Sequence, residues 1–359
     1  MNKTAFAEYL WIDGDQPTQQ IRSKARVVRV PEIPRPSDFP DWSFDGSSTG
    51  QASGDDSDCL LQPVRVYADP LRHGGNYLVL CEVNAADGRP HPSNERGRFR
   101  RLLDVVAEAE YPWLGFEQEY TLFRGDRPLG FPESGEPAPQ GPYYCGAGSQ
   151  VTYGRDFVEA HADACVRAGV LFYGINAEVM PGQWEFQIGY RGIDGECPNA
   201  LRAADDLWVA RYLLHRCGEQ FGIRVSLDPK PAKGDWNGAG LHTNFSTSAT
   251  RDPNIGLSEI QRIVDALEIA HDEHIRHYGD RLGERLTGLH ETSDIATFNS
   301  GVAHRGASIR IPQPVAQKGY GYLEDRRPGA NADPYRVGSC LISVVVTDRN
   351  QASVEDRAA

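Results

Sequence analysis

The sequence predicts an α+β protein in which a small strand-rich N-terminal domain precedes a larger domain of mixed strands and helices. Three observations support this fold class. Residues up to about 90 form short apolar segments between turn-rich loops. Later residues alternate between strand-like and helix-like periodicity. The polar stretch DGRPHPSNER, at 87–96, separates the two patterns, and a chain of 359 residues is long enough for two domains.

We therefore predict one domain over 1–92, a second over 93–347 and a disordered tail over 348–359, which is polar and charged. In the first domain, strands are predicted at 7–14 and 76–83. Clusters of Pro, Gly, Ser and Asp predict loops at 35–42 and 45–58. Ser93 or Asn94 is expected to cap a helix over 95–110, which opens the second domain.

The second domain continues with helices and strands in alternation. Further helices are predicted at 156–169, 200–222 and 258–279, and the first two end at a glycine, as a C-cap requires. Strands are predicted at 113–123, 171–180, 183–190, 241–247, 307–312 and 321–327. A loop rich in proline, glycine and aromatic residues lies at 128–148.

Charge and composition exclude several classes of protein. The net charge of −13 disfavours non-specific binding to nucleic acid. No apolar run is long enough for a membrane span, and the N-terminus does not resemble a secretory signal, so we expect a cytoplasmic protein that does not bind membranes. The seven cysteines are scattered and form no C-x-x-C, which fits reduced thiols.

A short apolar strand, GFEQEY at 115–120, carries two carboxylates on one face. Strand side chains alternate, so Glu117 and Glu119 point to the same side, roughly 6–7 Å apart. Two like charges on a buried face are unfavourable unless a cation neutralises them. An edge strand with a solvated face is the alternative interpretation, and by itself the commoner one.

A second pair of acids occurs in NAEVMPGQWEF, at 176–186. Pro181 and Gly182 suit the central positions of a type II turn. In a two-residue hairpin Glu178 would face Glu185 directly, where like charges are destabilising. A purely structural role explains one such pair tolerably and two poorly, whereas a cation site explains both.

Carboxylates with little sulfur or imidazole are hard ligands, suited to Mg²⁺ or Mn²⁺, and four acids indicate more than one ion. Further ligands are available on two later strands. His242 and Asn244 share one strand face, and Tyr322, Glu324 and Arg326 share another. Alone, His242 would more often be a core histidine and Glu324 a surface ion pair.

Arginines crowd the last third of the chain, at 285, 305, 310, 326 and 327. Arginine binds phosphate and carboxylate bidentately, and metals with arginines are typical of phosphoryl transfer. The common phosphate-binding loops are missing, because no G-x-x-x-x-G-K-[ST] occurs and two G-x-G fragments lack the third glycine. His271 and His274 have helical spacing but no obvious carboxylate partner, so packing or exposure is favoured over metal binding.

Taken together, these stretches resemble glutamine synthetase of the type II, eukaryote-like class. Matching segments cover nearly the whole chain and include FDGSSTGQ, GFEQEYTLF, GINAEVMPGQWEFQ, DPKPAKGDWNGAGLHTNFST, RLTGLHET, GVAHRGASIRIP and GYLEDRRP. The resemblance implies an N-terminal β-grasp-like domain and a catalytic domain with a curved antiparallel sheet flanked by helices. It implies ATP-dependent ligation of ammonium to the γ-carboxylate of L-glutamate through γ-glutamyl phosphate, giving L-glutamine, ADP and phosphate. It also implies a decamer of two pentameric rings with active sites shared between subunits.

The resemblance assigns individual residues. At least two ions, Mg²⁺ or Mn²⁺, would be bound, the first by Glu119, Glu178 and Glu185 and the second by Glu117, His242 and Glu324. ATP would contact Trp113, Glu185, Asn244, Ser246, Arg305, Arg310 and Tyr322. Glutamate would contact Asn237, Gly238, His242, Arg285 and Arg326. Asp45, with Ser48 close by, would bind ammonium and take its proton, Arg305 would bind phosphate, and Glu291 would lie on a flap over the intermediate.

Three departures from the family pattern do not remove a proposed ligand: Ser53, the long segment at 189–206 and the sequence at 293–300. Rival interpretations are a γ-glutamyl ligase that uses another small amine, a binding module for ATP or amino acids, and a non-catalytic homologue. A non-catalytic homologue should have lost metal ligands, whereas all six are present here.

Overall fold

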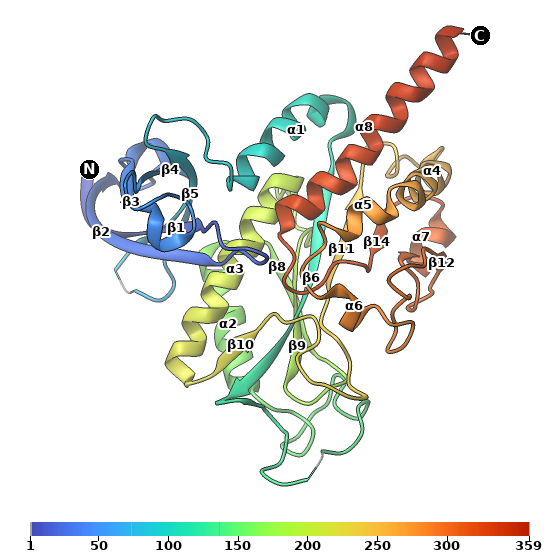
Figure 1. Ribbon diagram of the computed structural model, residues 1–359, viewed down its shortest axis with the longest axis horizontal. Helices are drawn as coiled ribbons and strands as arrows, with labels where there is room; N and C mark the ends of the chain where they lie inside the picture. Colours follow the sequence, from blue (N-terminus) through green and yellow to red (C-terminus); the bar gives the residue numbers. More distant parts are fainter. Residues whose placement is uncertain (1, 73, 136, 359) are drawn as a thin grey trace.

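The computed structural model describes residues 2–72, 74–135 and 137–358, with side chains left out at 107–109 and 347–358. Figure 1 shows a small N-terminal sheet beside a larger body of strands and helices. Of the described helices, none has the length and apolar character that crossing a membrane requires. The seven cysteines are free, as the sequence predicts.

The N-terminal sheet has five strands in the order β2-β1-β5-β4-β3. Its strands are β1 (Asn2–Ile12), β2 (Ile21–Pro31), β3 (Trp42–Asp45), β4 (Asp58–Ala68) and β5 (Tyr77–Ala85). β1 and β5 are parallel and the other pairs antiparallel. Two 3-10 helices, η1 (Pro36–Asp38) and η2 (Gly46–Thr49), lie in the predicted loops. β2, β3 and β4 were not assigned from the sequence. β2 alternates basic and apolar residues and so looks like a solvated segment.

The larger sheet has nine strands, and seven of them form the row β12-β13-β14-β11-β6-β9-β8. They are β6 (Trp113–Arg124), β8 (Phe172–Ala177), β9 (Gln183–Ile188), β11 (Leu241–Ser246), β12 (Ser300–Val302), β13 (Ile309–Ile311) and β14 (Leu323–Asp325). β7 (Arg127–Pro128) and β10 (Arg224–Ser226) pair with β6 outside that row. The described pairs are antiparallel except β12 with β13, so the predicted antiparallel sheet is mixed at this edge.

The helices are α1 (Glu95–Glu110), α2 (Arg155–Ala168), α3 (Ala200–Phe221), α4 (Gly256–Ile269), α5 (His271–Ile275), α6 (Leu282–Arg285), α7 (Gln313–Lys318) and α8 (Pro334–Ala358). Asn94 caps α1, because its Oδ1 accepts from the backbone N–H of Gly97 at 2.9 Å. The single helix predicted over 258–279 is wrong. The chain breaks at Ala270, where ψ is 6°, and α5 turns its histidines inward. α8 was also not predicted, and the disorder predicted for 348–359 stays a prediction because those side chains lie outside the described residues.

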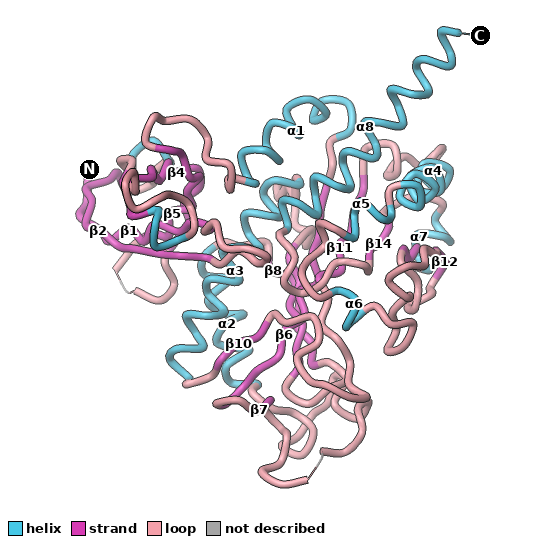
Figure 2. Tube along the Cα trace, viewed as in Figure 1, coloured by secondary structure: helices cyan, strands magenta, loops and turns pink. Residues whose placement is uncertain are grey.

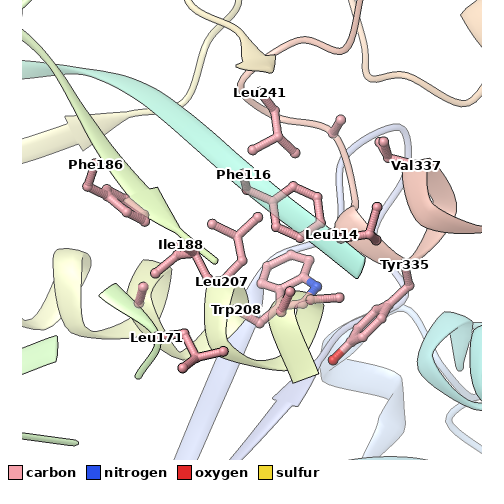
Figure 3. Close-up of a cluster of buried hydrophobic side chains, with 14 of the residues drawn as sticks. Leu114, Phe116, Leu171, Phe186, Ile188, Leu207, Trp208, Leu241, Tyr335 and Val337 are labelled. Atoms are coloured by element: carbon pink, nitrogen blue, oxygen red, sulfur yellow. The ribbon is translucent and has the colours of Figure 1, made fainter. Parts of the chain in front are cut away.

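One face of the large sheet packs on α3 and α8, as the side chains in Figure 3 show. Leu114 and Phe116 of β6 point into this core, where they meet Trp208 of α3 and Val337 of α8. Because strand side chains alternate, Glu117 is turned to the opposite face. Figure 2 shows long loops beside the large sheet, and residues of such loops, among them Gln140, Asn237 and Glu291, line a cavity on that face. The core therefore fixes which face of the sheet carries the acids.

Candidate active site

Acidic and polar side chains meet across neighbouring strands on the loop-bordered face of the sheet. Glu185 on β9 lies opposite Glu119 on β6. One step along β6, Glu117 lies opposite His242 on β11. Asn244, next on that face of β11, lies opposite Glu324 on β14. The shared face that the alternation predicts for Glu117 and Glu119 is confirmed, since both border the same cavity.

The predicted hairpin has the right turn but the wrong register. Gln183 N–H donates to the carbonyl of Met180, and Gly182 has φ 72°, so Pro181 and Gly182 occupy the turn as predicted. The pairing of Glu178 with Glu185 is wrong, however, because Asn176 is the residue opposite Glu185.

The register differs because β8 ends at Ala177. The backbone N–H of Glu178 donates to Gln183, and the carbonyl of Val179 accepts from Gly141 in the long loop. Residues 179–182 therefore form a wider connection than two residues. The like-charged partner directly opposite Glu185 is Glu119 from the neighbouring strand β6.

The six predicted metal ligands all line one cavity of about 430 Å³. Within it, Glu117, His242 and Glu324 bring one ligand atom each to within 4.8 Å of one another, as do Glu119, Glu185 and His242. The first group is the set that the resemblance assigns to the second ion. The other group differs from its assigned set, because His242 takes the place of Glu178.

Burial makes ionisation of the carboxyl groups in this cavity unfavourable. It raises the pKa of Glu178 to about 8, an effect that the nearby Glu119 reinforces. The pKa of Glu185 is well above its usual range because of burial and, next, Glu117 and Glu119. A bound cation would stabilise the ionised forms of these carboxylates.

Arginines supply part of the opposing charge at the other side of the cavity. Arg326 and Arg310 each donate to Glu324 at 2.5 Å, one to each carboxylate oxygen. Arg285 Nη2 lies 3.0 Å from His242 Nε2. Burial, with Arg326 and Arg285 beside it, holds the pKa of His242 well below its usual range, which leaves the imidazole neutral. Carboxylate oxygens with one neutral imidazole fit hard divalent cations.

The residues predicted to bind glutamate border the same cavity. Asn237, Gly238, Arg285 and Arg326 line it, together with Arg305 and Arg310. A β-carbon at Gly238 would lie only 2.7 Å from Arg285 Cγ and from the carbonyl oxygen of Pro229, so only glycine allows the backbone to approach Arg285 this closely. Arg285 is buried, and burial lowers its pKa to about 10.

A second cavity of about 570 Å³ contains the residues predicted to hold the nucleotide, Trp113, Asn244, Ser246 and Tyr322. The ring of Trp113 lies 5.2 Å from that of Tyr190 and has the guanidinium of Arg251 4.2 Å from its centre. Asn244 donates to Glu117 at 2.9 Å, which connects this cavity to the acidic one. Aromatic walls beside a charged cavity fit a planar base with an attached phosphate chain.

Glu291 borders the acidic cavity from the loop that follows α6. Asp45 and Ser48 border neither of the two cavities. They lie at the end of β3 and in η2, in the N-terminal sheet, which Figure 1 shows apart from β6 and β11. Ser47 Oγ and Ser48 Oγ both donate to Asp45 at 2.6 Å, and these bonds, with Ser47 the larger cause, hold its pKa below the usual range. This chain therefore does not bring its own Asp45 to its own metal ligands.

Several lining residues were not found from the sequence. They are Gln140, Tyr144, Asn176, Gln187, His290 and Thr292 in the acidic cavity, and Tyr173, Tyr190, Arg251, Lys318 and Tyr320 in the aromatic one. Gln187 could have been found, because it follows Glu185 by two positions on the same strand. Most of the others lie on loops, where the sequence carries no periodicity.

His271 and His274 pack in the interior, which is one of the two arrangements that the sequence favoured over metal binding. Both are buried, and their Nδ1 atoms lie 3.2 and 3.3 Å from the guanidinium of Arg327, which also pairs with Asp325. Asp325 and Arg327 thus point to the opposite face of β14 from Glu324 and Arg326. This buried cluster holds the strand that carries Glu324.

Two family models match the chain: "Glutamine synthetase, beta-Grasp domain" over residues 3–86 and "Glutamine synthetase, catalytic domain" over residues 93–263. The chain is 52% identical to the chloroplastic glutamine synthetase of Chlamydomonas reinhardtii, over 95% of this chain and 90% of that one. It is 52% identical to glutamine synthetase of Amanita muscaria, over 96% and 94% of the two chains. The cytosolic isozyme 1-2 of Oryza sativa subsp. japonica is 51% identical, over 92% and 91%.

Proposed function

The chain belongs to the glutamine synthetase family, and we propose from this premise that its acidic and aromatic cavities together form the site of ligation. The protein is a glutamate–ammonia ligase, which uses ATP to join ammonium to the γ-carboxylate of glutamate. Its activity belongs to glutamine biosynthesis and nitrogen assimilation. The observation that carries the site proposal is the convergence of six ligand side chains from four strands and one connecting loop on a single cavity, beside an aromatic one.

In this proposal each cavity holds one part of the reactants. The aromatic cavity takes the base of ATP against Trp113 and Tyr322, and Asn244 lies where the two cavities join. The phosphates then extend towards Arg305 and Arg310, and glutamate lies against Arg285, Arg326 and the backbone at 237–238. This arrangement brings the γ-carboxylate to the terminal phosphate, which is the geometry that formation of γ-glutamyl phosphate needs.

The donor set would hold two divalent ions, Mg²⁺ or Mn²⁺. Glu117, His242 and Glu324 would hold one, and Glu119 and Glu185, with Glu178 beside them, the other. When bound, such ions neutralise phosphate and carboxylate charge. Glu324 is held by Arg310 and Arg326, so the protein orients this ligand from its own residues. Neutral His242 has the imidazole form that a ligand requires.

The ammonium half of the reaction is assigned to Asp45. Its carboxylate is exposed on the N-terminal sheet, oriented by Ser47 and Ser48. We propose that Asp45 enters the acidic cavity of a neighbouring subunit, binds ammonium and then takes a proton from it. This assignment needs a head-to-tail ring, such as the two pentameric rings of a decamer. We also propose a cytoplasmic location, which the seven free thiols support.

The test is a coupled assay of ADP release and glutamine formation. ADP release should depend strictly on both glutamate and ammonium. Ethylamine and putrescine, supplied in place of ammonium, should give no ligation. Turnover with either amine would instead assign the protein to γ-glutamyl ligases of another acceptor. Glu324→Gln should abolish synthesis, because it removes a metal ligand while keeping the shape of the side chain.

A further inference from the structure

The loop that carries Glu291, residues 287–294, is closed at its base, and we call it the lid loop. Thr287 and Asp294 form a bridge, and Ile295 N–H donates to Leu286 just outside it. Inside the loop, Thr292 Oγ1 lies 2.8 Å from the carbonyl of Leu289 and 3.2 Å from that of Arg285. These bonds shape the loop from within, but none of them fixes its tip to the opposite wall of the acidic cavity.

The tip of the lid loop has an unfavourable backbone. His290 and Glu291 have φ of 52° and 58°, the left-handed region that residues with a Cβ rarely adopt. Two such residues in succession persist only when the surroundings hold them. Leu289, next to them, is 65% exposed, so burial of the tip does not supply that restraint.

His290 does supply contacts across the cavity. Its Nδ1 lies 3.3 Å from Nε2 of Gln140, in the long loop that follows β7. Its Nε2 lies 3.2 Å from Oδ1 of Asp235, in the loop before β11. The imidazole is only 16% exposed, whereas the Asp235 side chain is almost fully exposed. One side chain therefore connects three loops around the cavity mouth.

The backbone N–H of Asn237 determines the direction of the hydrogen bond between Gln140 and His290. Asn237 N–H donates to Oε1 of Gln140 at 2.6 Å, which fixes the orientation of the Gln140 amide. The Gln140 Nε2 must then donate to Nδ1 of His290, and the other ring nitrogen of His290, Nε2, faces the Asp235 carboxylate. Because Asn237 also borders the proposed glutamate position, the chain of contacts links the lid tip to that position.

We propose that His290 is the latch of the lid loop, a positioning residue that keeps Glu291 over the cavity by binding Gln140 and Asp235. The proposal rests on the proposed function, in which Glu291 shields the acyl phosphate from water. Loss of the latch should leave reactant binding largely intact but let the lid open more often. Water would then intercept part of the intermediate, so ADP release would exceed glutamine formation.

The experiment measures the ratio of ADP released to glutamine formed in three His290 variants and one control variant of the full-length enzyme. His290→Ala removes both contacts and should raise this ratio about fivefold, the change expected for loss of a net hydrogen bond. His290→Asn can keep an acceptor near Nδ1 for Gln140, and His290→Gln can keep a donor near Nε2 for Asp235. Each should give a smaller increase than His290→Ala. His277→Ala is the matched control, because that exposed histidine pairs with Glu273 at 3.1 Å on α5 and its neighbouring turn.

Glu291→Ala separates this inference from the function it rests on. If Glu291→Ala raises the ratio and His290→Ala leaves it at the wild-type value, the positioning role of His290 is wrong. The shielding role of Glu291 is then still supported. If neither variant raises the ratio, the lid assignment itself is wrong. A folding defect would lower both products in proportion without moving the ratio, and such a result for His290→Ala overturns the latch as well. A rise in the ratio at unchanged KM for glutamate supports it.

Discussion

Glu119 and Glu185 lie directly opposite each other on β6 and β9, and both side chains are buried. One hydrogen bond to each carboxylate offsets part of the cost of burying its charge. The N–H of Gly240 donates to Glu119, and Gln187 donates to Glu185 at 2.6 Å. Like charges in facing positions destabilise a sheet. The sequence keeps this pair in the centre of the sheet, which indicates that the pair serves binding rather than folding.

Removal of divalent metal should therefore destabilise the protein. Each ion present at about 100 times its Kd contributes about 2.7 kcal/mol to the free energy of unfolding, and chelation removes that contribution. We expect a drop of several degrees in Tm, measured by calorimetry with and without EDTA. Glu185→Gln should shrink the difference, because it removes one ligand and one buried charge. An unchanged Tm after chelation would contradict the shared-cation interpretation of Glu119 and Glu185.

Glu291→Ala should uncouple the reaction rather than stop it. Glu291 borders the acidic cavity from the lid loop, and the proposed role is to exclude water from the acyl phosphate. ADP should then form several times faster than glutamine, measured by quantifying both products in the same reaction. An equal loss of the two products would show that Glu291 binds a reactant instead.

Acid stability should depend on His161, which is fully buried on α2 with its Nε2 3.0 Å from the carbonyl of Ala210. Burial lowers its pKa to about 4. Between about pH 6.5 and 4 the unfolded chain therefore binds a proton that the folded chain does not, so stability is lost as pH falls through this window. The loss is at most about 3 kcal/mol.

His161→Gln should flatten the dependence of unfolding free energy on pH between 6.5 and 4, measured by urea denaturation. Part of the slope should remain, because burial also lowers the pKa of His274 to about 4. If His161→Gln and wild type have parallel curves, this histidine is not the acid-sensitive group.

Mixed particles of two inactive variants test the shared site. Asp45→Ala and Glu324→Ala homo-oligomers should each be nearly inactive. In a random equal mixture a site keeps Asp45 from one subunit and Glu324 from its neighbour about a quarter of the time, so roughly a quarter of the activity should return. Co-expression, or dissociation and reassembly, makes the mixture. An inactive particle that is shown to contain both variants would mean that Asp45 does not complete a neighbour's site.

The apolar periodicity and the capping residues of individual segments made much of the fold predictable. α1 begins and ends at the predicted residues, since Asn94 supplies a cap and the apolar period is clear. α4 and α5 were predicted as one helix, because the break at Ala270 comes from contacts of His271 and His274 with Arg327, which is distant in sequence. The two-residue alternation also placed Glu117 beside Glu119 and Glu324 beside Arg326, since it depends only on strand geometry.

The sequence by itself determined the family, the residues that we propose as metal ligands and, for those on strands, which of them share a face. Tertiary structure alone decided which carboxylates meet. Strand order and register are long-range properties, and a shift of two residues at β8 replaces Glu178 by Asn176 opposite Glu185 without changing any local pattern. The contacts of His290 with Gln140 and Asp235 were likewise invisible in the sequence, because they join loops whose approach is set by the sheet between them.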